Sequence, residues 1–228
     1  MDSDGVATPF EPVVCDYFVT ESTFGLPVFQ WQDPLLIFEE IKQWWQQNAS
    51  EGRPSIIAAY SLGKAQRILK NLAPDIGPLI SHPSVEKINA VTREAGVELP
   101  MTYDLSDVSS EDLEKSLIIC PLRSLDSKWA EPIKNPLIGV ASGWMALRST
   151  RKRRNFSRGF VLSDHADWNG LNKAIKLTKA EHIYVTHGYT QVYTKYLNEQ
   201  GYKAAIVKTK FEGESLDTQQ ADTSQVTV

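Results

Sequence analysis

The chain of 228 residues is 42% hydrophobic and 23% charged, enough for one large core or two small ones, and carries a formal net charge of −4. This charge excludes a globally basic nucleic-acid-binding protein, so any anion-binding surface must be local. Only two cysteines occur, Cys15 and Cys120, which excludes a zinc site of cysteine pairs and indicates a reduced, cytoplasmic setting. Neither a membrane-spanning apolar run nor a secretory signal is predicted.

Short apolar runs that alternate with helical patterns predict the secondary structure. The first strand is expected at 15–19 and leads into a loop at 20–25. The elements that follow are helix 35–47, strand 55–60, helix 62–71, strand 78–81, helix 84–95, strands 117–120 and 137–141, a strand from 159 that stops at His165, helix 168–177, strand 182–186, helix 189–200 and strand 204–208. Repeated strand–helix units imply a parallel sheet covered on both faces. The polar residues 211–228 are predicted to be disordered.

Two histidines stand where apolar runs give way to helices. His165 follows one run, and His187 ends the next and precedes Gly188, which removes a side chain where a ligand can approach. The carboxyl ends of parallel strands meet at one edge of a sheet, so both histidines are expected to face one site. Glu21, in the loop after the first strand, is a carboxylate that can orient a histidine. We therefore predict that Glu21, His165 and His187 cluster in space.

The segment around His165 also has a plainer interpretation. Asp164 can cap the following helix, with His165 as a polar loop residue, and for a single motif this interpretation would be preferred. The recurrence at His187 favours a functional site instead. Asp164 and Asp167 are predicted to shape the turn rather than to react, and the other two histidines are predicted to be structural.

Basic residues gather just before the strand that leads to His165. They are Arg151, Lys152, Arg153, Arg154 and Arg158. A solvated loop is the usual explanation, but a contact with a phosphate backbone is predicted here because the cluster adjoins the candidate site. Ser61, Gly63 and Lys64 open a helix after a buried strand, a geometry that can bind phosphate, although the spacing is not that of a P-loop.

Three segments, taken together, resemble motifs A, B and C of the metallo-β-lactamase/β-CASP nucleases. They are VTESTFG at 19–25, SDHADW at 163–168 and VTHG at 185–188. The resemblance extends in particular to the bacterial DNA ligase-associated exonucleases, through PFEP at 9–12, LGKAQ at 62–66 and HPSV at 82–85. It covers nearly the whole chain up to Lys208, and three motifs in order are far more specific than one.

The resemblance implies an α/β fold in which a β-CASP domain, a parallel sheet flanked by helices, is inserted into a partial metallo-β-lactamase αββα fold. The expected parts are the end of an N-terminal metallo-β-lactamase part at 1–33, the β-CASP domain at 34–154, a C-terminal metallo-β-lactamase part at 155–210 and the tail at 211–228.

The resemblance also implies zinc-dependent hydrolysis of DNA phosphodiesters in repair or end processing, with two zinc ions that activate water. His187 would ligate one zinc ion, and His165, oriented by Glu21, would contact the scissile phosphate or protonate the leaving oxygen. The His-x-His-x-Asp-His motif of the family and its further ligands are absent from this sequence, which resembles the C-terminal portion of such an enzyme. The isolated chain is therefore expected to bind little zinc and to be inactive alone.

Other functions stay open at this point. One is a nuclease of the same family that processes RNA 3′ ends, and another is a noncatalytic remnant that binds nucleic acid or regulates. An unrelated serine hydrolase is disfavoured, because no G-x-S-x-G elbow occurs and Ser142 lacks the first glycine. The expected partners are DNA, or RNA in the alternative, and a DNA ligase and a helicase of the same repair system, but no membrane.

Overall fold

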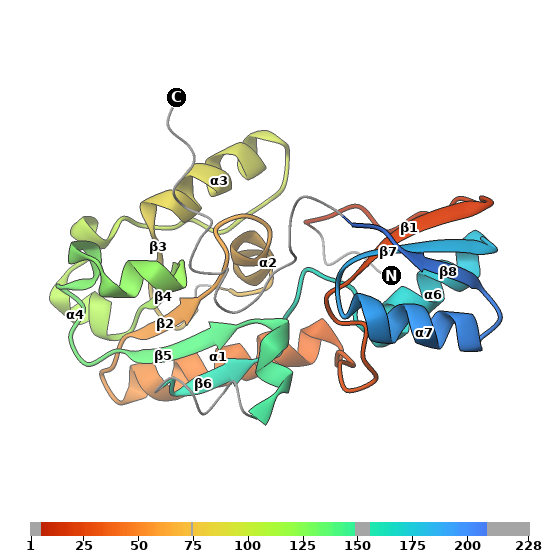
Figure 1. Ribbon diagram of the computed structural model, residues 1–228. Helices are drawn as coiled ribbons and strands as arrows, with labels where there is room; N and C mark the ends of the chain where they lie inside the picture. The colour runs from red at the N-terminus through yellow and green to blue at the C-terminus, as the bar shows by residue number, and fades with distance from the viewer. Residues whose placement is uncertain (1–5, 74, 149–155, 209–228) are drawn as a thin grey trace. The chain divides into compact units, whose positions relative to one another are not determined.

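The computed structural model describes residues 6–73, 75–148 and 156–208, which form two compact units (Figure 1). One unit comprises Pro9–Trp31 and the chain from His165 onward, and we call it the three-stranded unit. The other comprises Gln32–Asp164 and is called the five-stranded unit. The chain thus passes between the units after Trp31 and again after Asp164.

The three-stranded unit is a parallel sheet with helices packed on one face. Its strands lie in the order β1-β7-β8, and its elements are β1 (Tyr17–Ser22), α6 (Trp168–Thr178), β7 (His182–Gly188), α7 (Thr190–Glu199) and β8 (Lys203–Ile206). Successive side chains of a strand point to opposite faces, so Ile183 and Val185 pack against Leu171 of α6 and Leu197 of α7. This alternation forms the core of the unit.

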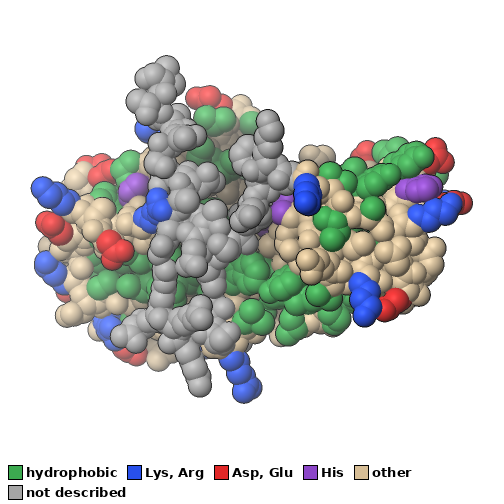
Figure 2. Space-filling view, viewed as in Figure 1, with side chains coloured by type: hydrophobic (Ala, Val, Ile, Leu, Met, Phe, Trp, Pro, Cys, Tyr) green, Lys and Arg blue, Asp and Glu red, His purple; other side chains and the backbone are tan. Residues whose placement is uncertain are grey.

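The other face of β1 carries apolar side chains that reach solvent among the described residues. Tyr17 is 60% exposed and Val19 is 59% exposed, and Figure 2 shows hydrophobic side chains along this strand. The Tyr17 ring stacks on His182 of β7, with ring centroids 4.8 Å apart. Parallel sheets are usually covered on both faces, so this exposed apolar face is unusual.

The five-stranded unit is a parallel sheet in the order β3-β4-β2-β5-β6. Its strands are β2 (Ser55–Ala58), β3 (Leu79–Ser81), β4 (Leu117–Cys120), β5 (Leu137–Ala141) and β6 (Arg158–Phe160), and its helices are α1 (Pro34–Ser50), α2 (Lys64–Lys70), α3 (Pro83–Glu94) and α4 (Ser110–Glu114). Ile57 faces a core that includes Trp45 of α1 and Leu69 of α2. Ile56 faces a second core on the opposite side with Leu105 and Ile133.

Parallel sheets flanked by helices confirm the predicted α/β class. The finer assignment, a β-CASP domain inserted in a metallo-β-lactamase fold, stays a prediction. Within the described residues, no helix has both the length and the apolar character needed to cross a membrane.

Two predicted strands end elsewhere than expected. β1 continues to Ser22, so Glu21 lies in the strand and not in a loop. β6 ends at Phe160 and pairs with β5, so the prediction that a strand stops at His165 is wrong. The Phe160 carbonyl accepts from the Leu162 N–H at 3.0 Å, and Leu162 is buried in the core, so the apolar residues after Phe160 fill the interior without extending the ladder.

Candidate functional site

Glu21 and His165 meet in the three-stranded unit. Glu21 Oε1 lies 3.3 Å from His165 Nδ1, and the two side chains are 23% and 26% exposed. Trp31 holds the histidine backbone in place, because its indole N–H donates to the His165 carbonyl oxygen at 3.0 Å. The Phe24 ring lies edge-on to the imidazole, with centroids 6.0 Å apart. The predicted approach of Glu21 and His165 is therefore confirmed.

The environment of Glu21 favours its charged form. Burial alone would raise the pKa of Glu21, but hydrogen bonds from His165 and Thr23, with the attraction of His165, together lower it below its ordinary value. The backbone N–H of Thr23 donates to Glu21 Oε2. When His165 Nδ1 carries a proton, it donates to the ionised Glu21 carboxylate, and Nε2 is the ring nitrogen turned toward other groups. A histidine held in this way can donate a proton to an oxygen, or accept one from it, at a defined position.

His187 lies on the strand next to Glu21. β7 pairs in parallel with β1, and the register shifts between Thr20 and Ser22, so that Ser22 stands opposite Gly188. Ser22 Oγ donates to the His187 carbonyl oxygen at 2.8 Å, and His187 Nδ1 lies 3.2 Å from Thr186 Oγ1. The structure therefore places His187 at the same edge of the sheet as Glu21, while its role as a ligand stays a prediction.

Gly188 is required by the backbone. Its φ angle is +93°, and a Cβ atom added there would lie 2.3 Å from the carbonyl carbon of Ser22. Only glycine can bring β7 this close to the irregular end of β1. The interpretation that Gly188 leaves room for a ligand is thus replaced, because the neighbouring strand occupies that space.

The two aspartates near His165, Asp164 and Asp167, make their contacts in different units. Asp167 is the N-cap of α6: its Oδ1 accepts from the Gly170 N–H at 2.7 Å and its Oδ2 from the Trp31 N–H at 2.8 Å. The plainer interpretation had assigned this cap to Asp164. Asp167 therefore shapes the turn, as predicted, and ties it to the segment that ends at Trp31.

Asp164 is the partner of two cations in the five-stranded unit. Lys64 Nζ lies 3.5 Å from Asp164 Oδ2, and Arg67 Nη1 lies 3.7 Å from Asp164 Oδ1. Arg67 also donates to the Ser163 carbonyl oxygen at 2.6 Å. Burial lowers the pKa of Arg67, and Asp164 opposes that change. The Lys64 side chain is only 4% exposed, which argues against a direct phosphate contact by Lys64.

Arg158 is the member of the basic cluster that the structure describes. Its Nη2 atom lies 3.2 Å from Glu40 Oε2 on α1, and the two side chains are 50% and 42% exposed. An exposed ion pair of this kind contributes little stability, so Arg158 can exchange Glu40 for another anion. Arg151, Lys152, Arg153 and Arg154 lie outside the described residues, and their contact with nucleic acid stays a prediction.

Two of the segments that carry the resemblance, at 62–66 and 82–85, lie side by side at the starts of α2 and α3. Ser61, in the turn after β2, and Ser84, in the first turn of α3, share a hydrogen bond of 2.9 Å. Gln66 Nε2 donates to Asn89 Oδ1 at 2.8 Å, and both side chains are buried. These contacts fix the turn that presents Lys64 to Asp164, so the two segments have a structural role in the five-stranded unit.

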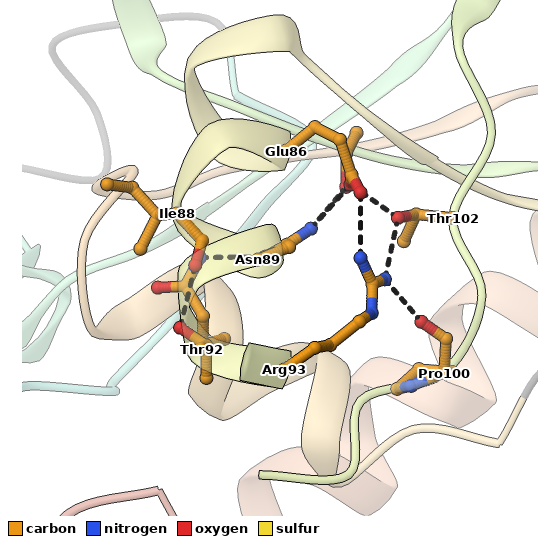
Figure 3. Close-up of polar contacts among 9 residues, drawn as sticks. Glu86, Ile88, Asn89, Thr92, Arg93, Pro100 and Thr102 are labelled. Atoms are coloured by element: carbon orange, nitrogen blue, oxygen red, sulfur yellow. Dashed lines mark hydrogen bonds and ion pairs between the residues drawn. The ribbon is translucent and has the colours of Figure 1, made fainter. Parts of the chain in front are cut away.

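Asn89 also connects this turn to a carboxylate nearer the surface (Figure 3). Glu86 accepts hydrogen bonds from Asn89 at 2.8 Å, Arg93 at 2.7 Å and Thr102 at 2.5 Å. Burial opposes the charge of Glu86, but these three bonds outweigh it and lower its pKa. The network ties α3 to the strand-like segment that contains Thr102, and nothing in the spacing of the sequence indicated it.

The residues present do not fit the zinc ions that the resemblance implies. Within 6–73, 75–148 and 156–208, no group of three or more His, Cys, Asp or Glu side chains is arranged to hold a metal ion. A catalytic zinc ion takes three protein ligands as a rule. The Glu21 carboxylate, moreover, is already bound to His165 and Thr23.

Comparison with known proteins gives a partial likeness. No family model matches the chain. The chain is 26% identical over 200 residues to a protein named "Probable DNA ligase" from Opitutus terrae (strain DSM 11246 / JCM 15787 / PB90-1). The alignment covers 87% of this chain and 19% of the relative, so the chain spans about a fifth of the length of that protein.

Proposed function

We propose that the chain carries part of the machinery of a metallo-β-lactamase/β-CASP nuclease that hydrolyses phosphodiesters at DNA ends. The observation that carries the proposal is the Glu21–His165 pair at 3.3 Å, with His187 at the same sheet edge. These are the residues that the resemblance assigns to catalysis and metal ligation. The name of the relative supports a DNA-associated function, and a DNA ligase as a partner belongs to the proposal.

In this proposal His165 is the group that meets the phosphate. Glu21 keeps the proton on Nδ1 and stabilises the charged imidazolium, so Nε2 can donate a hydrogen bond or a proton to an oxygen of the phosphodiester. Trp31 fixes the backbone of His165, so the position of the ring is set before substrate binds. The residues described hold too few ligands to derive any step through a metal ion.

A second candidate function has its own support. The lack of a metal-holding group within the described residues favours a noncatalytic role in binding nucleic acid. RNA stays an alternative substrate, because contacts with a phosphate backbone carry no sequence information. Competition between single-stranded DNA and RNA of equal length distinguishes these substrates.

Elemental analysis and a cleavage assay on the purified chain test the proposal. We expect less than one equivalent of zinc and no cleavage of end-labelled DNA above background, because the ligand set is incomplete. Stoichiometric zinc, together with metal-dependent cleavage that His187→Ala abolishes and Lys195→Ala does not, would show that the chain holds a complete centre. Failure to bind DNA or RNA even at low salt would overturn both candidate functions.

A further inference from the structure

An aromatic cluster adjoins the candidate site in the three-stranded unit. Its inner members, Phe24 and Phe29, are 2% and 0% exposed, and their rings meet edge-on with centroids 4.9 Å apart. Its outer members, Trp31 and Tyr189, are half-buried and lie against Phe29, with centroids 6.1 and 6.0 Å away. The inner rings therefore belong to the core, whereas each outer ring keeps part of its surface in contact with solvent.

Tyr189 is fixed next to the strand that carries Glu21. Its backbone N–H donates to the Ser22 carbonyl oxygen at 2.9 Å, and Ser22 directly follows Glu21 on β1. The Tyr189 ring is tilted by only 33° from that of Phe29, so the two rings are closer to parallel than to perpendicular. Because Phe29 is fully buried, it covers the inner side of the Tyr189 ring. The exposed part of Tyr189 thus lies on the side away from Phe29.

The same cluster connects Tyr189 to His165. The Phe24 ring lies 4.9 Å from that of Phe29 and 6.0 Å from the His165 imidazole, measured between ring centroids. Trp31, the other outer ring, is held by the hydrogen bond of 3.0 Å from its indole N–H to the His165 carbonyl oxygen. A DNA strand with a phosphate at His165 would therefore have half-exposed aromatic rings near its bases.

Half-exposed aromatic rings next to a phosphate site suit an unpaired base. Every base has a π-face, so stacking on an aromatic side chain tolerates any sequence, whereas a base within a duplex is already stacked on its neighbours. We propose that Tyr189 is a stacking platform for an unpaired base of a DNA strand whose phosphate meets His165. This role rests on the proposed function, and it narrows the substrate of that site to DNA with a single-stranded end.

An abasic scan of a short single strand, followed by fluorescence anisotropy, tests the stacking on the full chain. An abasic site keeps the phosphates and removes one base, so at one position it should weaken binding to the wild type about tenfold. Tyr189→Leu should weaken binding of the intact strand by a similar factor, and the abasic site should then cause little further loss. The slope of log affinity against log salt concentration should not change, because no phosphate contact is removed.

Two further variants separate stacking from a general loss of structure. Tyr189→Phe keeps the ring and should bind like the wild type. Tyr184→Leu removes a half-buried tyrosine of β7 that stacks on Tyr17, and it should leave the affinity unchanged. Equal losses for Tyr189→Leu and Tyr184→Leu, or an abasic scan in which no position weakens wild-type binding, would overturn the stacking role while the proposed function stands. A chain that binds no nucleic acid at low salt would overturn both, and the abasic scan stays decisive if Tyr189→Leu does not fold.

Discussion

Gly188→Ala is expected to destabilise the three-stranded unit by about 3 kcal/mol, the sum of a strained left-handed backbone and a clash in a packed site. The added Cβ would meet the Ser22 carbonyl carbon at 2.3 Å, and Ser22 is in the backbone of the neighbouring strand, which cannot move aside cheaply. Urea unfolding followed by circular dichroism measures the loss.

Gly201→Ala is the matched control for this substitution. Gly201 follows α7 in the same unit and has a φ angle of +91°, but a Cβ atom there would meet no atom within 4 Å. It should therefore show only the backbone cost, about 1 kcal/mol. Equal losses at Gly188 and Gly201 would mean that the close approach of β7 to β1 does not exist in solution.

Replacement of Arg151, Lys152, Arg153 and Arg154 by alanine should weaken the binding of single-stranded DNA alike for all sequences. Each neutralised phosphate releases counterions and contributes about −0.7 to the slope of log affinity against log salt concentration. The slope should therefore flatten by about 0.7 for every phosphate that the variant no longer binds. Fluorescence anisotropy of labelled DNA on monodisperse protein, over a range of salt concentrations, measures both effects.

The control for this experiment removes the same charge elsewhere. Lys87, Lys173, Lys176 and Lys195 are exposed on helices α3, α6 and α7, and their replacement by alanine changes the net charge equally. This control should leave the slope nearly unaltered. If the two quadruple variants bind alike, the effect is one of net charge, and the cluster at 151–154 does not bind the phosphate backbone.

The regular elements were predictable where the local pattern and the tertiary environment agree. Strands 117–120 and 137–141 were predicted with the bounds that the structure has, because each is a short apolar run between polar turns. The apolar residues after Phe160 were misread, since a buried extended segment and a strand have the same composition. β6 ends at Phe160 because its pairing with β5 ends there, although the apolar residues continue.

The candidate site was predictable in part. The expected position of Glu21 and His165 at strand ends led to the pair that the structure shows, although Glu21 lies within β1 and β6 ends at Phe160. The ion pair of Lys64 and Asp164 was not predicted. A buried lysine needs a carboxylate partner, but the sequence does not show that this partner comes from a distant turn.

We propose that the sheet edge with Glu21, His165 and His187 faces nucleic acid. The chain has four histidines, so their ring resonances give four separate probes. His182, at the opposite end of β7, and His82, which caps α3, are internal controls. In a titration with a short single-stranded DNA, we expect the ring resonances of His165 and His187 to shift while those of His82 and His182 stay unchanged. Saturation with DNA that leaves His165 and His187 unmoved would contradict it.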